Sequence, residues 1–252
     1  MRPFLFFAVT AGALVGLARA AEPQRFASGP TQVALVELYT SEGCSSCPPA
    51  ERWIAGRKND AGLWRDFVPV AYHVDYWNRL GWTDRFSSRE FTQRQYALAA
   101  AWGGDSVYTP CFVRDGAEWP ERGSRELRPS TAKAGVLVVT TDGAKVGVEF
   151  TPAGVAANAK QQDDFEIHVA LLGGGLVSKV TAGENSGETL KQEFVALALS
   201  SHVLTDGGVV QRAEFALPTA SVKNAPPRAL AAWVTRRGKF ESLQATGGWL
   251  AQ

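Results

Sequence analysis

The sequence is poor in residues that bind metals or form disulfides, with three cysteines, three histidines and one methionine among 252 residues. It contains no second C-x-x-C pair and no H-x-x-x-H pair, so the usual four-ligand zinc site is disfavoured. Two of the three cysteines nevertheless stand close together, in Cys44-Ser45-Ser46-Cys47. This dithiol is the strongest candidate for a functional centre.

The sequence also lacks an excess of charge of either sign. Its 26 basic and 25 acidic residues give a formal net charge of +1. This balance offers no electrostatic attraction to nucleic acid or to an anionic membrane. The 45% of apolar and 20% of charged residues are typical of a globular protein. We therefore expect no nucleic-acid partner.

A hydrophobic run long enough to cross a membrane is missing too. The apolar run Phe4–Leu17 has only fourteen residues, whereas a spanning helix needs about 20. Arg2 precedes the run, and Ala18-Arg19-Ala20 follows it with the small-x-small form of a cleavage site. We expect residues 1–20 to be a signal peptide, with a retained anchor as the alternative. The mature protein is then periplasmic or secreted, with no membrane span.

The first half of the mature chain alternates between strand and helix patterns. Pro48 and Pro49 follow Cys47 directly, and proline is favoured in the first turn of a helix. Ser87 and Glu90 have capping-box spacing. The predicted elements are a strand at 33–39, a helix at about 47–58, a strand at 67–74, a helix ending near 102 and a strand at 107–113.

After about residue 134 the pattern changes to strands separated by turns rich in proline and glycine. Strand-like runs occur at 136–141, 145–150, 165–172, 190–199, 209–216 and 229–235. Strands at this spacing without helices between them are typical of an antiparallel sandwich. We therefore predict two domains, at 30–130 and at 131–252.

The dithiol has a direct chemical interpretation. A helix N-terminus lowers the pKa of a thiol from about 8.5 toward roughly 3.5–7.5. Cys44 is then the nucleophile, and Cys47 attacks the mixed disulfide and releases the substrate thiol.

Two other roles for the cysteine pair stay open. One is a permanent structural disulfide, although so short a loop contributes little stability. The other is a metal site, either zinc or copper held by Cys44, Cys47 and His73, because thiolate and imidazole suit copper. His73 is more often a hydrogen-bonding group than a ligand.

The order of these elements, with Thr109-Pro110 before the third strand and Asp115-Gly116 after it, resembles the thioredoxin superfamily. The resemblance implies a cis Thr109–Pro110 bond beside the dithiol. It implies an α/β fold, a thioredoxin-like domain with an insertion after the second strand. A smaller antiparallel β-sandwich domain would follow it.

A narrower resemblance rests on Thr40-Ser-Glu-Gly-Cys-Ser-Ser-Cys-Pro-Pro-Ala-Glu51, His73-Val-Asp-Tyr-Trp-Asn-Arg-Leu-Gly-Trp82, Val107-Tyr-Thr-Pro110 and Gly183-Glu-Asn-Ser-Gly187. These segments are similar to a bacterial family of secreted thioredoxin-like proteins that carries a domain-of-unknown-function label. The family pattern has Gln after Thr-Pro, where this chain has Cys111.

From the residues and the resemblance together we expect a thiol–disulfide oxidoreductase that acts on protein or small-molecule thiols and disulfides without a cofactor. Glu37 is the candidate general base, and Thr109, Pro110 and Trp77 are the candidate substrate contacts. Cys111 is a possible third thiol, with packing as the alternative. A non-catalytic binding module, including a copper-binding or metallochaperone-like protein, is the competing function.

Overall fold

The computed structural model describes residues 22–120, 126–154, 164–205, 208–220 and 222–251. The predicted signal peptide, residues 1–20, lies outside the described residues. Among those described, no helix combines the length and hydropathy needed to cross a membrane.

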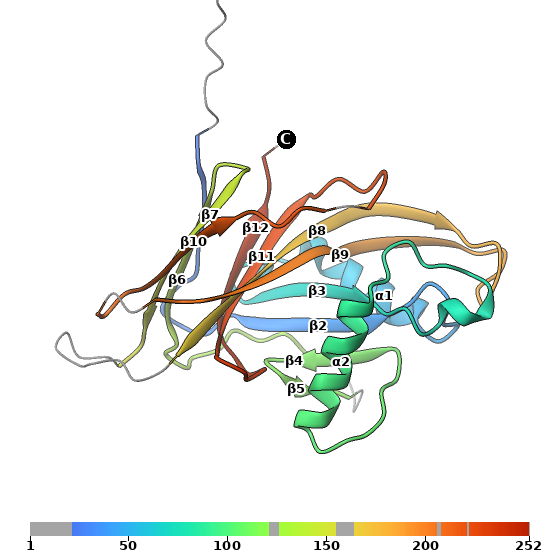
Figure 1. The fold of residues 1–252 in the computed structure, drawn as a ribbon, viewed down its shortest axis with the longest axis horizontal. Helices are drawn as coiled ribbons and strands as arrows, with labels where there is room; N and C mark the ends of the chain where they lie inside the picture. Colours follow the sequence, from blue (N-terminus) through green and yellow to red (C-terminus); the bar gives the residue numbers. More distant parts are fainter. Residues whose placement is uncertain (1–21, 121–125, 155–163, 206–207, 221, 252) are drawn as a thin grey trace, which may run out of the picture.

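The structure is built mainly from two β-sheets, of four and eight strands (Figure 1). The smaller sheet has the order β1-β6-β7-β10 and the larger one the order β12-β11-β8-β9-β3-β2-β4-β5. The strands are β1 (Gln24–Ala27), β2 (Ala34–Thr40), β3 (Phe67–His73), β4 (Cys111–Arg114), β5 (Ala117–Glu118), β6 (Gly135–Thr141), β7 (Lys145–Pro152), β8 (Phe165–Lys179), β9 (Thr189–Val203), β10 (Gln211–Ala216), β11 (Ala229–Arg236) and β12 (Ser242–Trp249).

Two α-helices occur in the described part of the chain. Helix α1 (Pro48–Ala55) begins directly after Cys47 and continues as the 3₁₀ helix η1 (Gly56–Asn59). Helix α2 (Arg89–Ala101) follows the short 3₁₀ helix η2 (Asn78–Leu80). The Ser88 hydroxyl accepts a hydrogen bond from the Glu90 amide, so the N-cap lies one residue after the Ser87 that the sequence suggested.

The predicted fold class was wrong. The protein is mostly β, with 45% strand and 13% helix, rather than an α/β thioredoxin-like domain followed by a separate sandwich. Strands β2 and β3 correspond to the strands predicted at 33–39 and 67–74, and they are parallel neighbours. However, β3 also pairs in parallel with β9, through Ala71 and Val195. The C-terminal strands therefore extend the sheet that carries the dithiol.

The error came from β8 and β9, each of which is fifteen residues long. Gly173-Gly174-Gly175 reads as a turn in the sequence, but the structure places it inside β8, where the register with β9 shifts. Glycine permits such irregularities within a strand because it lacks a side chain. The hairpin thus continues past these bulges to the end of the sheet that carries the helices (Figure 1).

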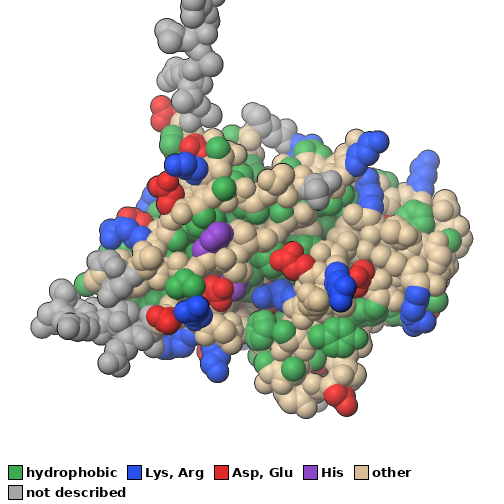
Figure 2. All heavy atoms as spheres, in the orientation of Figure 1, with side chains coloured by type: hydrophobic (Ala, Val, Ile, Leu, Met, Phe, Trp, Pro, Cys, Tyr) green, Lys and Arg blue, Asp and Glu red, His purple; other side chains and the backbone are tan. Residues whose placement is uncertain are grey.

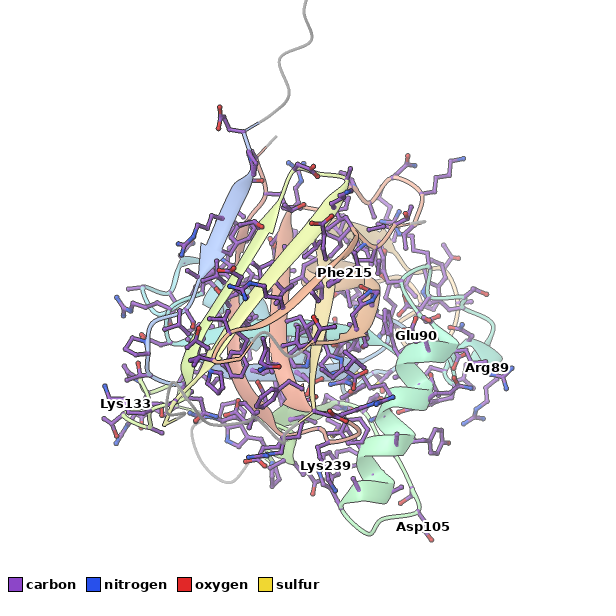
Figure 3. All side chains as sticks on the ribbon, turned by 60° about the vertical axis from the view of Figure 1, so that its left-hand side comes forward. Arg89, Glu90, Asp105, Lys133, Phe215 and Lys239 are labelled. Carbon is purple, nitrogen blue, oxygen red and sulfur yellow. The ribbon has the colours of Figure 1, made fainter. Side chains whose placement is uncertain are left out.

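The two faces of the large sheet carry different layers. The four-stranded sheet packs over β8, β11 and β12 around a core that includes Leu137, Phe150 and Ile167. Helix α1 lies on one face of the β2–β3 region, where the Thr40 hydroxyl donates to Glu51. Helix α2 lies on the opposite face, where Arg94 pairs with Glu37. Figure 3 shows α2 running from Arg89 and Glu90 at one end toward Asp105 at the other.

Both sheets contain strands from each side of residue 130, the expected domain boundary. In the large sheet, β3 has a neighbour on each side, and one of them is β9. We therefore expect a fragment of residues 22–130 to stay unfolded, because β3 would keep β2 but lose β9 and expose an apolar edge. Circular dichroism and urea unfolding, compared with residues 22–252, test this; a cooperative transition in the fragment would contradict the expectation.

Candidate functional site

The dithiol lies in the turn between the end of β2 and the start of α1. The Cys44 amide donates to Ser41 O at 3.1 Å, and the Cys47 amide donates to Cys44 O at 3.2 Å. The carbonyl of Cys47 then accepts the first amide bonds of α1, from Ala50 and Glu51. Both thiols are free and buried, whereas Ser45 and Ser46 between them are exposed.

The surroundings of Cys44 stabilise its thiolate. Its Sγ lies 3.3 Å from the Ser46 hydroxyl, which can donate to a thiolate, and the protonated thiol donates to the Thr109 carbonyl oxygen at 3.8 Å. A hydrogen bond from the Cys47 thiol, followed by bonds involving Ser46 and Thr109, outweighs burial and lowers the pKa of Cys44 to about 6. A thiol with such a pKa is largely ionised at neutral pH.

Cys47 has the opposite property. Burial and the hydrogen bond to Cys44 raise the pKa of Cys47 well above that of an ordinary thiol. Its thiol also has a hydrogen bond with the Thr40 hydroxyl, which donates to Glu51 Oε1 at 2.7 Å. The sequence interpretation missed Glu51, although its place one helical turn after Cys47 was visible.

Glu51 is a buried carboxyl group beneath the dithiol. Its second oxygen accepts a bond of 3.0 Å from the Gln192 side chain on β9. Burial raises the pKa of Glu51, although His73, Thr40 and Gln192 act in the other direction. Thr40 therefore links Cys47 to a carboxyl group that exchanges a proton more readily than a free glutamate at neutral pH.

The loop before β4 forms the other wall of the site. The Thr109–Pro110 peptide bond is cis, as the resemblance implied. The Trp77 indole N–H donates to the Thr109 hydroxyl at 2.8 Å, so the structure brings Trp77, Thr109 and the dithiol together. Pro110 occupies the position next to them, and Tyr76 also has a hydrogen bond with Thr109.

The turn between β8 and β9 reaches the dithiol from the far end of the chain. The buried Asn185 amide donates to the carbonyls of Glu42 and Cys44, both at 2.9 Å. Glu184 Oε2 accepts from the Ser45 amide at 2.9 Å and from its hydroxyl at 2.7 Å. Gly183-Glu-Asn-Ser-Gly187 contributed to the family resemblance, but nothing in the sequence indicated that it contacts Cys44.

His73 belongs to a buried polar cluster rather than to the thiols. Its Nδ1 lies 2.6 Å from Asp84. Burial lowers the pKa of His73, but Asp84 and two glutamates outweigh it and raise the pKa to about 9. Asp84 also accepts the Glu42 amide. In the described part of the chain, no three His, Cys, Asp or Glu side chains converge in a way that would hold a metal ion.

Glu37 lies on the face of β2 away from α1, so it does not reach the dithiol. Side chains alternate along a strand, and Thr40 faces α1. Arg94 of α2 donates two hydrogen bonds to Glu37, at 2.7 and 3.1 Å. The Arg94 guanidinium also lies over the rings of Tyr72 and Trp233, both at 5.6 Å. Glu37 thus anchors α2 on the sheet.

Cys111 lies on the same face of the sheet as Glu37, away from α1. It pairs directly with Tyr39, and Tyr39 lies two residues after Glu37 on β2, so the two share a face. Its thiol is buried, which raises its pKa to about 11. It borders a cavity of about 300 Å³ with Gln95, Trp102, Tyr108 and Glu118. The sheet separates Cys111 from the α1 side, where the dithiol lies.

Residues 35–235 match the family described as "Protein of unknown function (DUF1223)". The chain belongs to this family. The matched region contains the dithiol, Thr109–Pro110 and the β8–β9 turn. Among the curated proteins, no relative matches.

Two solved structures show a similar fold. One is protein AGR_C_4864 from Agrobacterium tumefaciens, with a TM-score of 0.58 and 22% identity over 86% of this chain and 94% of that one. The other is HBP35 of Porphyromonas gingivalis, with a TM-score of 0.56 and 11% identity over 88% of this chain and 76% of that one. At these identities the likeness concerns the fold alone.

The Cys44 thiolate can be tested through its rate of alkylation as a function of pH. We expect the rate to rise with pH, with a midpoint near pH 6, the pKa of Cys44, because only the thiolate reacts. Cys47→Ala should move the midpoint upward, since it removes the strongest hydrogen bond to the thiolate. Cys111→Ala serves as the control and should leave the profile unchanged; a midpoint near pH 8.5 in the wild type, the value of a free thiol, would contradict the assignment.

Proposed function

We propose that this protein is an exported thiol–disulfide oxidoreductase in which Cys44 is the nucleophile and Cys47 the resolving thiol. The observation that carries this proposal is the pair of opposed pKa values within one Cys-Ser-Ser-Cys turn. A permanent structural disulfide has no use for a low-pKa first thiol with a hydrogen-bonded partner. The exported location rests on the N-terminal pattern of Arg2, the apolar run and Ala18-x-Ala20.

The proposed reaction follows from the positions of the two thiols. The Cys44 thiolate attacks one sulfur of a partner disulfide, and the other partner sulfur leaves as a thiolate. Cys47 then loses its proton and attacks Cys44 Sγ, which releases the second partner thiol and closes the Cys44–Cys47 disulfide. The protein dithiol loses two electrons, and the partner disulfide gains them.

Thr109 and Trp77 position the partner in this proposal. The cis Thr109–Pro110 bond presents the Thr109 carbonyl to Cys44, and Trp77 fixes the Thr109 side chain. This local arrangement, rather than the overall fold, is what supports the resemblance to thioredoxin-like proteins. Cys44 is buried in the reduced protein, so a partner sulfur reaches it when the exposed Ser46 side chain moves aside.

Glu51 is the proposed proton acceptor for Cys47. The Thr40 hydroxyl donates to Glu51, and a hydroxyl oxygen that donates its proton can still accept another, here the proton of the Cys47 thiol. Transfer along this chain lets Cys47 become a thiolate although it is buried. Glu37, held by Arg94 on the opposite face, takes no part.

Turnover tests the oxidoreductase proposal. With dithiothreitol as electron donor, the protein should catalyse reduction of insulin disulfides, and Cys44→Ser should abolish it. Cys47→Ser should accumulate a mixed disulfide between Cys44 and the partner, visible by mass spectrometry under non-reducing conditions. Cys111→Ser is the matched control and should retain activity. Absence of both turnover and trapped species would overturn the proposal.

The proton relay makes a separate prediction. Glu51→Gln should slow the resolution of the mixed disulfide by about tenfold or more, in the range of general acid–base effects. Alkylation of Cys44 should change little, because Glu51 does not touch that thiol. Thr40→Val should reproduce this pattern, since it breaks the link while keeping Glu51. Equal rates of resolution in the wild type and both variants would reduce Glu51 to a structural role.

A further inference from the structure

The β8–β9 turn places an acidic side chain on the exposed side of the dithiol loop. Both bonds of Glu184 go to Ser45, the residue that follows Cys44. Ser45 is also one of the two exposed residues between the cysteines. A partner that approaches the dithiol therefore meets the Glu184 carboxylate.

The position of Glu184 is held by the turn that carries it. The neighbouring Asn185 is buried and donates to the carbonyls of Glu42 and Cys44. Backbone bonds close the turn, from Val180 N to Glu188 O and from Gly187 N to Val180 O, both at 2.9 Å. Two independent sets of contacts thus hold the carboxylate beside Ser45.

Glu184 also occupies the hydrogen-bond donors that an anionic partner would use. The Ser45 amide and hydroxyl precede α1 and point to the exposed side, where a partner carboxylate could otherwise bind. The amide and hydroxyl bonds from Ser45 lower the pKa of Glu184, so the group is charged at neutral pH. Arg79 contributes to this shift as the nearby basic side chain.

The face seen in Figure 2 shows acidic and basic side chains interspersed, with no single sign gathered over a wide area. The net charge of the whole chain is only +1. Among the described side chains, Glu184 is the acid that is hydrogen-bonded to an exposed residue between Cys44 and Cys47, so it is placed to select partners by charge.

We propose that Glu184 is a specificity-determining residue that disfavours anionic thiols and disulfides, such as glutathione, and favours neutral or cationic ones. This inference rests on the oxidoreductase function proposed above. The preferred substrate is then a neutral or basic polypeptide segment that carries a cysteine, rather than glutathione.

Three small disulfides that differ in charge test the inference. They are oxidised glutathione, which is anionic, cystamine, which is cationic, and bis(2-hydroxyethyl) disulfide, which is neutral. Each accepts two electrons from the reduced Cys44–Cys47 pair and yields two thiols. Rates with the charged disulfides are divided by the rate with the neutral one, which cancels any change in the reactivity of Cys44 itself.

In the wild type, the normalised rate should be higher with cystamine than with oxidised glutathione. Glu184→Gln keeps a side-chain oxygen for Ser45 but removes the charge. This substitution should raise the normalised rate with oxidised glutathione and lower the normalised rate with cystamine, by about three- to tenfold each. That is the size expected for one charge close to the reacting groups. About 1 M salt should shrink these differences.

Glu188→Gln is the matched control, because Glu188 is an exposed acid of the same turn whose backbone holds the hairpin. It should change both ratios by less than about twofold, since charge effects weaken with distance. Identical ratios in the wild type and Glu184→Gln, with brisk oxidation by all three disulfides, would overturn the role of Glu184 and leave the oxidoreductase function standing. Failure of the wild type to react even with the neutral disulfide would overturn both.

Discussion

The parallel pairing of β9 with β3 is the contact on which the arrangement of the site depends. It joins the segment that carries the dithiol to strands more than a hundred residues later in the chain. Through it, Gln192 reaches Glu51 and the β8–β9 turn reaches Ser45 and Cys44. Without this pairing, the dithiol would still precede α1. However, Glu51 would lose its hydrogen bond from Gln192, and Glu184 would no longer lie beside Ser45.

The two faces of the large sheet separate two groups of polar residues. On the α1 face, Thr40 and Glu51 lie beneath the thiols. On the α2 face, Glu37 and Arg94 form a buried ion pair beside two aromatic rings. Breaking a buried ion pair on one side leaves an uncompensated charge, so Glu37 contributes to docking α2. Alternation along β2 places Glu37 and Thr40 on opposite faces of the sheet, which is why Thr40 reaches Glu51 while Glu37 reaches Arg94.

Within the dithiol, one hydrogen bond gives the two thiols opposite properties. Cys47 donates to Cys44, which stabilises the thiolate of Cys44 and disfavours ionisation of Cys47. In the reaction that we propose, the low-pKa thiol reacts first, and the second thiol stays protonated until Cys44 is tied up in a mixed disulfide. The buried Thr40–Glu51 pair is the proposed route for the proton at that stage.

The sequence alone determined the local features: the Cys44–Cys47 turn before a helix begun by two prolines, strands close to 33–39 and 67–74, and most strands of the second half. These depend on neighbouring residues, and periodicity and proline report them directly. Only the tertiary structure decided that β8 and β9 run through Gly173–Gly175 and join the first sheet, because bulges within a long strand look like turns. It also decided that Glu51 and Glu184, rather than Glu37, lie at the dithiol, and that Cys111 does not. Which face a side chain takes, and which distant strand lies beside it, follows from long-range pairing that no local pattern records.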